Sequence, residues 1–268
     1  MMQLLMILIG ITNFGQTDVL DAATANAVLE GIVVTANAIT PTTRLNNHVQ
    51  TLQKSFSVTN VQEKVDKAGR SSEIAYQKAL KLKALASDIE FALIINSAAV
   101  SGGTATARQL KGALGFIATN VTTAASGVSA SGVNETDFNA NLALIWAQGG
   151  KPSHAMGGSV QKRAISAFTG NNTRFISMEK SMVEAAVDVY KSDFGNVTLH
   201  LNFVMNTAAA GKVVILGDMG LWRKAWLYKP SWEELAKTGS FRSFFIEAAL
   251  TLESGNEKGA GKLTGYTV

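Results

Sequence analysis

A long segment without glycine or proline, residues 71–95, constrains the fold of this chain more than any other feature. It is rich in Ala, Leu, Lys, Glu and Gln, and Ser71 or Ser72 can cap its first turn. Its apolar residues recur at spacings of three and four, which places them on one face of a helix: Leu82, Leu85, Ile89 and Ala92. The lysines of the segment lie largely off that stripe. We therefore predict one long helix that is buried on one side and wet on the other.

An extended segment, Arg44–Val58, precedes this helix. Apolar residues such as Phe56 and Val58 alternate there with polar ones, a pattern that predicts a β-strand. We predict that Ile32–Thr35 forms the other strand of a hairpin, with its tip near residues 37–43. A two-stranded arm is at best marginally stable alone in water. An arm attached to a rigid helix therefore suggests a protein that is completed by a neighbouring subunit.

The composition limits the functions that are open to the chain. Its 268 residues can bury a full core, in one large domain or two small ones. Charged residues make up only 16%, which fits a surface that other subunits cover extensively. The net charge of +4 is spread along the chain, without a run of like charges. It allows an inner surface that faces nucleic acid, but ordinary surface lysines explain it more simply.

The residue types present also disfavour several kinds of site. The chain has no cysteine, so it has no disulfide, thiolate ligand or cysteine nucleophile. Its three histidines, His48, His154 and His200, lie far apart in the sequence, without a second ligand at metal-binding spacing. We therefore predict no metal site and no cofactor. The apolar segment Met1–Ile9 is too short to span a bilayer, and we expect it to pack as an arm on this or an adjacent subunit, with a misassigned start codon as the alternative.

The rest of the chain predicts helices first and strands afterwards. Further helices are predicted at Thr106–Thr119, at Asp137–Gln148 with Phe138, Leu142, Ile145 and Trp146 on one side, and at Ser159–Phe168. Strands are predicted at Met182–Tyr190, Gly195–Met205, Lys212–Leu216, Gly220–Tyr228 and Phe241–Leu252. A segment without charge between Thr119 and Val133 is the best domain boundary. This order of elements indicates an α+β fold with a largely antiparallel sheet.

Two short motifs are typical of serine acyl-transferases of the penicillin-binding class. Ser177 and Lys180 match S-x-x-K, in which a lysine activates the serine, and Lys237 begins a K-T-G motif. The motif expected between them is missing, and the two lie too close together for the helical domain of that fold. We predict instead that Lys237–Gly239 ends a helix. A cluster of tryptophans and basic residues, 222–232, is more typical of a buried strand with a basic rim than of a site for single-stranded nucleic acid.

A series of short segments, spread over the chain from Gln16 onward, points to a known family. The segments are Gln16–Leu20, Ala27–Gly31, Arg44–Val58, Ala68–Glu73, Ser87–Leu93, Trp146–Gly150, Tyr190–Gly195, Ala236–Gly239 and Leu252–Glu257. In this order they resemble the major capsid proteins of tailed bacteriophages, whose fold was first seen in phage Hong Kong 97. They are most similar to a subgroup from short-tailed phages. The chain departs from the family in its short N-terminal arm.

The resemblance implies a fold and a division of the chain. The fold has an N-terminal arm, an extended β-hairpin loop, a peripheral domain with a long spine helix, and an axial domain with mixed helices and an antiparallel sheet. The implied division is 1–27 for the arm, 28–66 for the extended loop, 67–119 for the peripheral domain, 120–235 for the axial domain, and 236–268 for a C-terminal strand that returns to the peripheral domain.

The resemblance also implies a function without catalysis. Such a protein self-assembles as pentamers and hexamers into the icosahedral head shell around a double-stranded DNA genome. Assembly takes place in the bacterial host cytoplasm, and the product is the capsid of the virion. The implied partners are other copies of the chain, a portal, scaffold or decoration proteins, and packaged DNA, which binds non-specifically at the inner surface. No membrane partner is implied.

Four charged residues are candidates for contacts between subunits: Arg44, Lys54, Asp66 and Arg70. Solvated surface charge is the default interpretation of each. We predict that reversing Arg44 and Lys54 to Glu leaves a folded subunit that does not form shells. The alternatives are an encapsulin-like compartment shell of the same fold, a serine acyl-transferase that uses Ser177, Lys180 and Lys237, and an exported surface protein.

Overall fold

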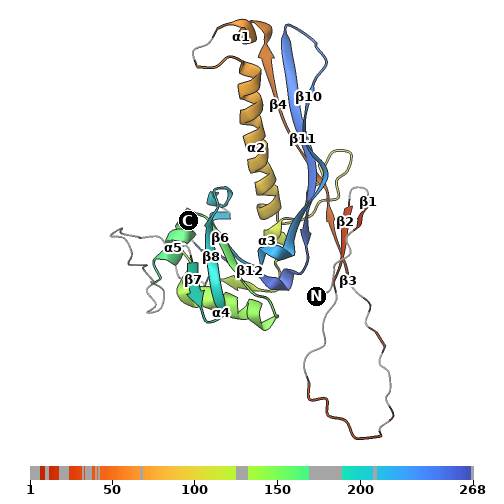
Figure 1. Ribbon diagram of the computed structural model, residues 1–268, viewed down its shortest axis with the longest axis vertical. Helices are drawn as coiled ribbons and strands as arrows, with labels where there is room; N and C mark the ends of the chain where they lie inside the picture. Colours follow the sequence, from red (N-terminus) through yellow and green to blue (C-terminus); the bar gives the residue numbers. More distant parts are fainter. Residues whose placement is uncertain are drawn as a thin grey trace.

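The computed structural model shows two connected parts, a tall column and a wider base (Figure 1). We call the long helix and the three long strands the column, and the six-stranded sheet with its helices the base. The structure describes residues 7–9, 12–17, 24–31, 33, 38–39, 41, 43–66, 69–124, 132–168, 189–207 and 210–266. Mixed helices and largely antiparallel strands confirm the predicted α+β class.

The predicted long helix is α2 (Glu73–Ile95), which runs along the column. At 1.5 Å per residue its 23 residues extend for about 34 Å. Ser72 caps it as predicted, because its Oγ accepts a hydrogen bond from the amide of Ala75. The Glu63 carboxylate, from the preceding helix α1 (Asn60–Lys64), accepts from Ser72 and from the first two amides of α2. These contacts satisfy donors that every helix leaves free at its N-terminus.

The apolar stripe on α2 is only partly buried. Leu85 and Ala92 are fully buried, as predicted, and Ile89 packs beside them. Leu82, which the periodicity places on the same face, is 45% exposed, so that prediction was wrong. The reason is that the sheet beneath the helix has only three strands, which is too narrow to cover the whole stripe.

The sheet of the column has the strand order β10–β11–β4 and is antiparallel throughout. Its strands are β4 (Gln50–Thr59), β10 (Trp222–Glu234) and β11 (Phe241–Ser254). Along β4, partly or fully buried residues alternate with exposed ones, as the period of two predicts. The predicted strands at 220–228 and 241–252 are confirmed. The tryptophan cluster lies on a strand as predicted, but the burial predicted for that strand was wrong, because no residue of β10 is fully buried. The helix predicted to end at Lys237–Gly239 was wrong, because this segment is the turn between β10 and β11.

The pairing predicted for the hairpin was also wrong. The Arg44 end of the extended segment forms β3 (Thr43–His48), which pairs with β2 (Thr12–Thr17), and β2 pairs with β1 (Ile7–Ile9). Of the predicted partner at 32–35, the structure describes only Val33, which lies outside any strand. β4 instead pairs over ten residues with β11. A long alternating strand distant in sequence offers more paired residues than the short local one.

The base is a six-stranded sheet with the order β5–β12–β9–β6–β8–β7. Its strands are β5 (Val121–Thr123), β6 (His154–Gly157), β7 (Val189–Ser192), β8 (Gly195–Leu201), β9 (Val214–Gly217) and β12 (Ala260–Thr264). The pairs β5–β12 and β6–β8 are parallel, and the other pairs are antiparallel. Helix α4 (Glu135–Ala147) packs against β12 and β5, and α5 (Ser159–Ser166) packs against β8.

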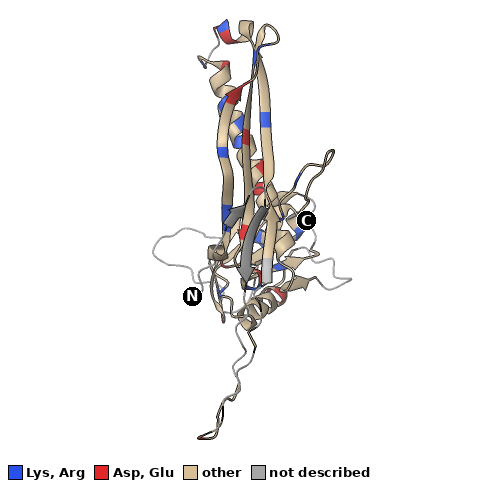
Figure 2. Ribbon diagram, turned by 90° about the vertical axis from the view of Figure 1, so that its right-hand side faces the viewer, with Lys and Arg blue, Asp and Glu red and all other residues tan. Residues whose placement is uncertain are grey.

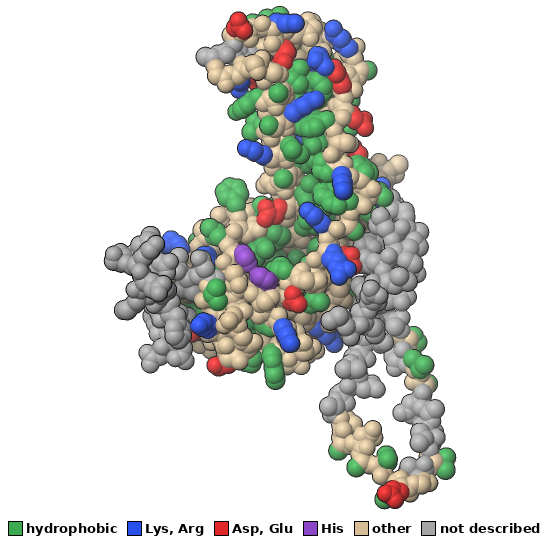
Figure 3. Space-filling model, viewed as in Figure 1, with side chains coloured by type: hydrophobic (Ala, Val, Ile, Leu, Met, Phe, Trp, Pro, Cys, Tyr) green, Lys and Arg blue, Asp and Glu red, His purple; other side chains and the backbone are tan. Residues whose placement is uncertain are grey.

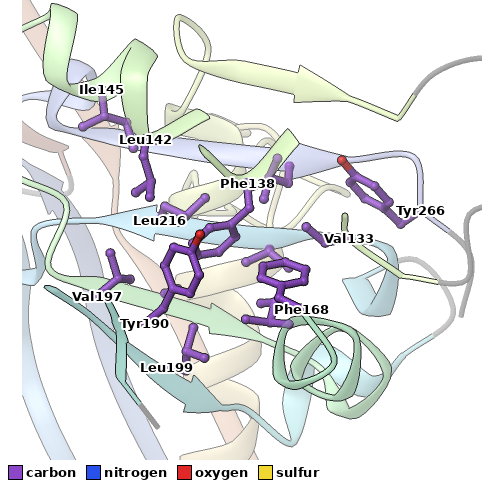
Figure 4. Close-up of a cluster of buried hydrophobic side chains, with 14 residues drawn as sticks. Val133, Phe138, Leu142, Ile145, Phe168, Tyr190, Val197, Leu199, Leu216 and Tyr266 are labelled. Atoms are coloured by element: carbon purple, nitrogen blue, oxygen red, sulfur yellow. The ribbon is translucent and has the colours of Figure 1, made fainter. Parts of the chain in front are cut away.

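The main core of the base is a cluster of aromatic and aliphatic side chains beneath α4 (Figure 4). Phe138, Phe168 and Tyr190 point toward one another and make edge-to-face contacts with ring centroids 5.1–5.9 Å apart. The predicted helix face is confirmed for Phe138, Leu142 and Ile145, which are fully buried. Trp146 was predicted on that face but is 61% exposed, because it lies one residue past Ile145, on the outer side of the helix.

Several helices and strands begin or end at other residues than predicted. The strand predicted at 195–205 ends at Leu201 and is followed by a short 3-10 turn, with Phe203 exposed. Of the strand predicted at 182–190, residues 182–188 lie outside the described part, and the rest begins β7. The helix predicted at 106–119 is reduced to α3 (Ala113–Phe116). The backbone at Gly112 lies so close to α2 that a Cβ atom there would come within 2.8 Å of the carbonyl oxygen of Ala92. This segment therefore packs against α2 as irregular backbone rather than as a helix.

The joint between column and base is held by polar contacts. The Glu257 carboxylate accepts hydrogen bonds from the amides of Ala118 and Thr119 and from the Thr119 hydroxyl. Burial alone raises the pKa of this carboxyl, but these hydrogen bonds outweigh burial and hold the pKa below its ordinary value. Burial lowers the pKa of Lys262, whose Nζ donates to the carbonyl of Leu114 at 2.9 Å. These contacts tie the connection after α3 to the last strands of the chain.

Candidate assembly surfaces

We use the name extended loop for residues 18–42, the chain between β2 and β3. The resemblance implies 28–66 for this loop, and that division stays a prediction. Its described residues lie beyond the base, far from the top of the column (Figure 1). Four of them are large apolar residues exposed at 71–94%: Val28, Leu29, Val33 and Ile39. Single exposed apolar residues are common, but four on one projecting segment indicate a contact surface. All charged residues of the loop are acidic: Asp18, Asp21 and Glu30.

A buried asparagine that the sequence analysis missed anchors the loop. Asn47 lies on β3, and its Nδ2 donates to the carbonyls of Lys111 and Leu252 at 3.0 and 2.8 Å. Its Oδ1 accepts from the amide of Lys111 at 2.8 Å. The side chain therefore joins the root of the loop to the end of β11 and to the connection between α2 and α3. A lone asparagine in a strand gives no sequence signal for such a role.

An apolar groove runs along the column between α2 and β10. It has a volume of about 380 Å³. Its lining is mostly apolar, and its two charged residues, Glu90 and Lys224, have opposite signs. The lining residues are Leu82, Leu85, Ala86, Ile89, Glu90, Leu93, Ile94, Lys224, Trp226 and Pro230. Hydrophobic side chains gather along this side of the column, with basic side chains among and beside them (Figure 3). The groove is an apolar surface that the described part of this subunit leaves open.

Two of the four charged candidates have partners within their own subunit. Lys54 Nζ lies 2.6 Å from Asp88 Oδ2, which joins β4 to α2. Arg70 Nε lies 3.2 Å from Glu73 Oε2, and its guanidinium sits 4.5 Å from the ring centroid of Tyr76. Each of these two side chains therefore has a partner within its own subunit.

The other two candidates lie elsewhere in the molecule. Asp66 is exposed after α1, and Arg44 lies on β3 opposite Gln16 in the register, near the root of the extended loop. The structure therefore does not bring the four residues together. Positive and negative side chains are interspersed along the column rather than gathered in one patch (Figure 2). Their role in contacts between subunits stays a prediction.

The motifs typical of a serine acyl-transferase form no site in the part of the chain that the structure describes. Ser177 and Lys180 lie outside that part, and Lys237 is exposed in the turn between β10 and β11. Within the described residues, no group of three or more His, Asp or Glu side chains could hold a metal ion. The structure does bring together two histidines that are distant in sequence, His154 and His200, on the surface of the base.

Comparison with known proteins identifies the family. A model of the SU10 major capsid protein family matches residues 11–267. The chain belongs to this family. No curated protein matches the capsid protein in sequence. A major capsid protein is a structural protein of the virion shell, so the predicted structural role of the chain is confirmed.

Solved structures share the fold of the capsid protein at low sequence identity. A chain in the structure from Gordonia phage Cozz superposes with a TM-score of 0.64 at 11% identity, covering 98% of this chain and 84% of that chain. A chain from the capsid of a native GTA particle gives 0.60 at 15% identity, covering 97% and 86%.

A chain of the SrpI encapsulin complex from Synechococcus elongatus PCC 7942 gives a TM-score of 0.56 at 11% identity, covering 85% of this chain and 77% of that chain. The predicted fold of the Hong Kong 97 type is therefore confirmed. Because encapsulins share it, the family match rather than the fold supports the capsid assignment. In the described part of the capsid protein, no helix combines the length and the hydrophobicity needed to cross a membrane.

Proposed function

We propose that this capsid protein assembles as rings of five and six subunits into an icosahedral head shell, and that the extended loop of each subunit lies in the column groove of a neighbour. The observation that carries the proposal is the pairing of two uncovered apolar surfaces on one chain. The loop exposes Val28, Leu29, Val33 and Ile39, and the groove between α2 and β10 is open. A loop and a groove at different places on one subunit form a head-to-tail contact, which closes into rings when the rotation permits.

The chemistry of the two surfaces supports this pairing. Burying a leucine-sized side chain contributes about 1.5–3 kcal/mol, so a few residues of the loop suffice for a contact of moderate strength. The loop carries only acidic charges, and basic side chains lie among and beside the apolar strip of the column. Many moderate contacts in a closed shell stabilise it far more than one contact stabilises a pair.

We further propose that the domains follow the two sheets. The column corresponds to the peripheral domain and the base to the axial domain. β10 then belongs to the peripheral domain and β12 to the axial domain, since each pairs within that sheet. Shell assembly in the bacterial host cytoplasm, packaging of double-stranded DNA, and contacts with portal, scaffold and decoration proteins are part of the same proposal. The modest net charge of +4 suits non-specific contact with DNA.

A matched pair of substitutions on α2 tests the groove. Ala79 and Ala86 are both exposed on this helix, but only Ala86 lines the groove. Ala86→Asp places a charge where the loop would bind, and we expect a folded subunit that forms no shells in electron microscopy. Ala79→Asp has the same helix propensity and charge and should assemble normally. Normal shells from Ala86→Asp would contradict the groove as the docking site.

A second pair of variants tests the loop. Leu29→Asp removes an 81% exposed leucine, and Asn26→Asp adds the same charge three residues away. We expect only Leu29→Asp to prevent shell formation. Its free energy of unfolding should change by less than about 0.5 kcal/mol, since the side chain contributes nothing to the isolated core. Loss of shells in both variants would assign the effect to charge rather than to apolar contact.

An encapsulin-like compartment is the second candidate, because an encapsulin shares the fold. The two candidates are distinguished by what the shells contain when the protein is co-expressed with the products of its neighbouring genes. DNA protected from nuclease supports the phage head, and a protein cargo without DNA supports the compartment. We also infer that the chain has no catalytic role, which absence of covalent labelling by a β-lactam probe at Ser177 would support.

A further inference from the structure

Two histidines on adjacent strands of the base lie in direct contact. β6 and β8 are parallel, and their register pairs His154 with Thr198 and Met156 with His200. The two histidines are therefore diagonal neighbours on the same face of the sheet. His154 Nδ1 lies 2.9 Å from His200 Nε2, and the ring centroids are 5.1 Å apart. His200 is exposed and His154 is half-buried, so the pair lies at the surface of the base.

The spacing of the two ring nitrogens suits a shared metal ion. Imidazole nitrogens bind zinc at about 2.0–2.1 Å, so two nitrogens at a right angle around one ion are about 2.9 Å apart. At a tetrahedral angle they are about 3.3 Å apart, which a small rotation of one ring reaches. The backbone beneath them is held firmly, since β6 pairs on one side with β8 and on the other with β9.

We propose that His154 and His200 form a two-histidine chelate for a divalent transition metal ion, with Cu²⁺ bound most tightly and Ni²⁺ and Zn²⁺ more weakly. Neutral imidazole suits these ions, and affinity for nitrogen ligands rises to Cu²⁺ and falls again at Zn²⁺. No group of three or more His, Asp or Glu residues gathers in the described part of the chain, so the protein supplies two ligands at this site and water completes the coordination. The site is therefore open and exchangeable, and every subunit of a shell carries one.

Because the chain has few histidines, metal binding can be assigned to individual residues. The protein has three histidines and no cysteine, and His48 lies on β3, outside the pair. Untagged protein is titrated with CuSO₄ by calorimetry and by electron paramagnetic resonance. We expect one site per chain whose spectrum shows two coordinated imidazole nitrogens. His154→Gln and His200→Gln should each weaken binding at least tenfold, and His48→Gln should leave it unchanged.

A thermal measurement gives an independent readout. A ligand that binds only the folded chain raises its melting temperature, by roughly 5 °C for a protein of this size when free Zn²⁺ is one hundred times its Kd. The three variants should melt like the wild type without metal, since glutamine keeps these positions polar. A shift in wild type and His48→Gln alone supports the chelate. Equal copper binding or equal shifts in His154→Gln and His200→Gln, or no binding by the wild type, would overturn it.

Discussion

The column and the base of this capsid protein bury their apolar side chains to different extents. In the base, α4 closes over a sheet of six strands, and Phe138, Leu142 and Ile145 are fully buried. In the column, one helix lies on three strands, and much of its apolar stripe stays partly exposed along an open groove. The core of the base is therefore closed, whereas the column is an incomplete layer that a neighbouring subunit can cover.

This difference has a simple physical origin. A packed core needs two layers that cover each other, and the long three-stranded sheet and its helix are too narrow to do so along their full length. A wide, short unit has the opposite geometry, with a small surface for its volume. A shell protein needs both, because the subunit must fold before assembly and still offer apolar surface to its neighbours.

Alanine substitution of one phenylalanine from each unit tests the comparison with the largest expected effect. Phe138→Ala should cost about 3–5 kcal/mol of unfolding free energy, since its ring is fully buried among aromatic partners. Phe56→Ala in β4 should cost only about 1–2 kcal/mol, because that ring is partly exposed in the isolated subunit. Chemical denaturation measures both, and Phe203→Ala, 83% exposed, is the neutral control. Equal costs for Phe138 and Phe56 would mean that the column is as closed as the base.

Glu257→Gln tests whether the joint couples the two units. The folded pKa of Glu257 lies below its ordinary value, so its carboxylate stabilises the fold above the unfolded pKa of about 4.3, and this contribution disappears as pH falls through the folded pKa. We expect a loss of about 1 kcal/mol at neutral pH and no difference from wild type in strong acid. Denaturation curves at several pH values measure it. A difference that does not depend on pH would remove the charge of Glu257 from the explanation.

A charge swap at Lys54 and Asp88 has the smallest expected effect on the subunit. The side chains are 34% and 40% exposed, so we expect a coupling of about 0.2–1 kcal/mol that weakens with salt. Lys54→Glu alone places two carboxylates together, and adding Asp88→Lys restores the pair. Arg44→Glu is then added to the swapped pair Lys54→Glu and Asp88→Lys. If this triple variant forms no shells although the swapped pair does, Arg44 acts between subunits. If Lys54→Glu alone blocks shells and the swap restores them, Lys54 acts within its own subunit.

Local patterns predicted the elements that depend on a few neighbouring residues. The spine helix with its Ser72 cap, the buried face of α4 and the long strands β4, β10 and β11 all follow from periodicity and propensity. Exposure was predicted less well, as Leu82 and Trp146 show, since it depends on how wide the opposing layer is. The motif Lys237–Gly239 predicts a helix end but forms a turn, because glycine follows helices and hairpin strands alike.

The sequence pattern did not predict the exposed surfaces or the groups of residues that meet in the fold. The apolar groove needs α2 beside β10, two elements separated by residues 96–221, and Asn47 reaches partners as distant as Leu252. His154 and His200 are separated in sequence and meet only through the parallel pairing of β6 with β8. The sequence alone therefore determined the α+β class and the long elements, because these rest on local order and composition, and the resemblance of its short segments indicated the family. The tertiary structure decided which strands pair, which apolar faces stay open and which polar groups meet, because those depend on contacts between residues far apart along the chain.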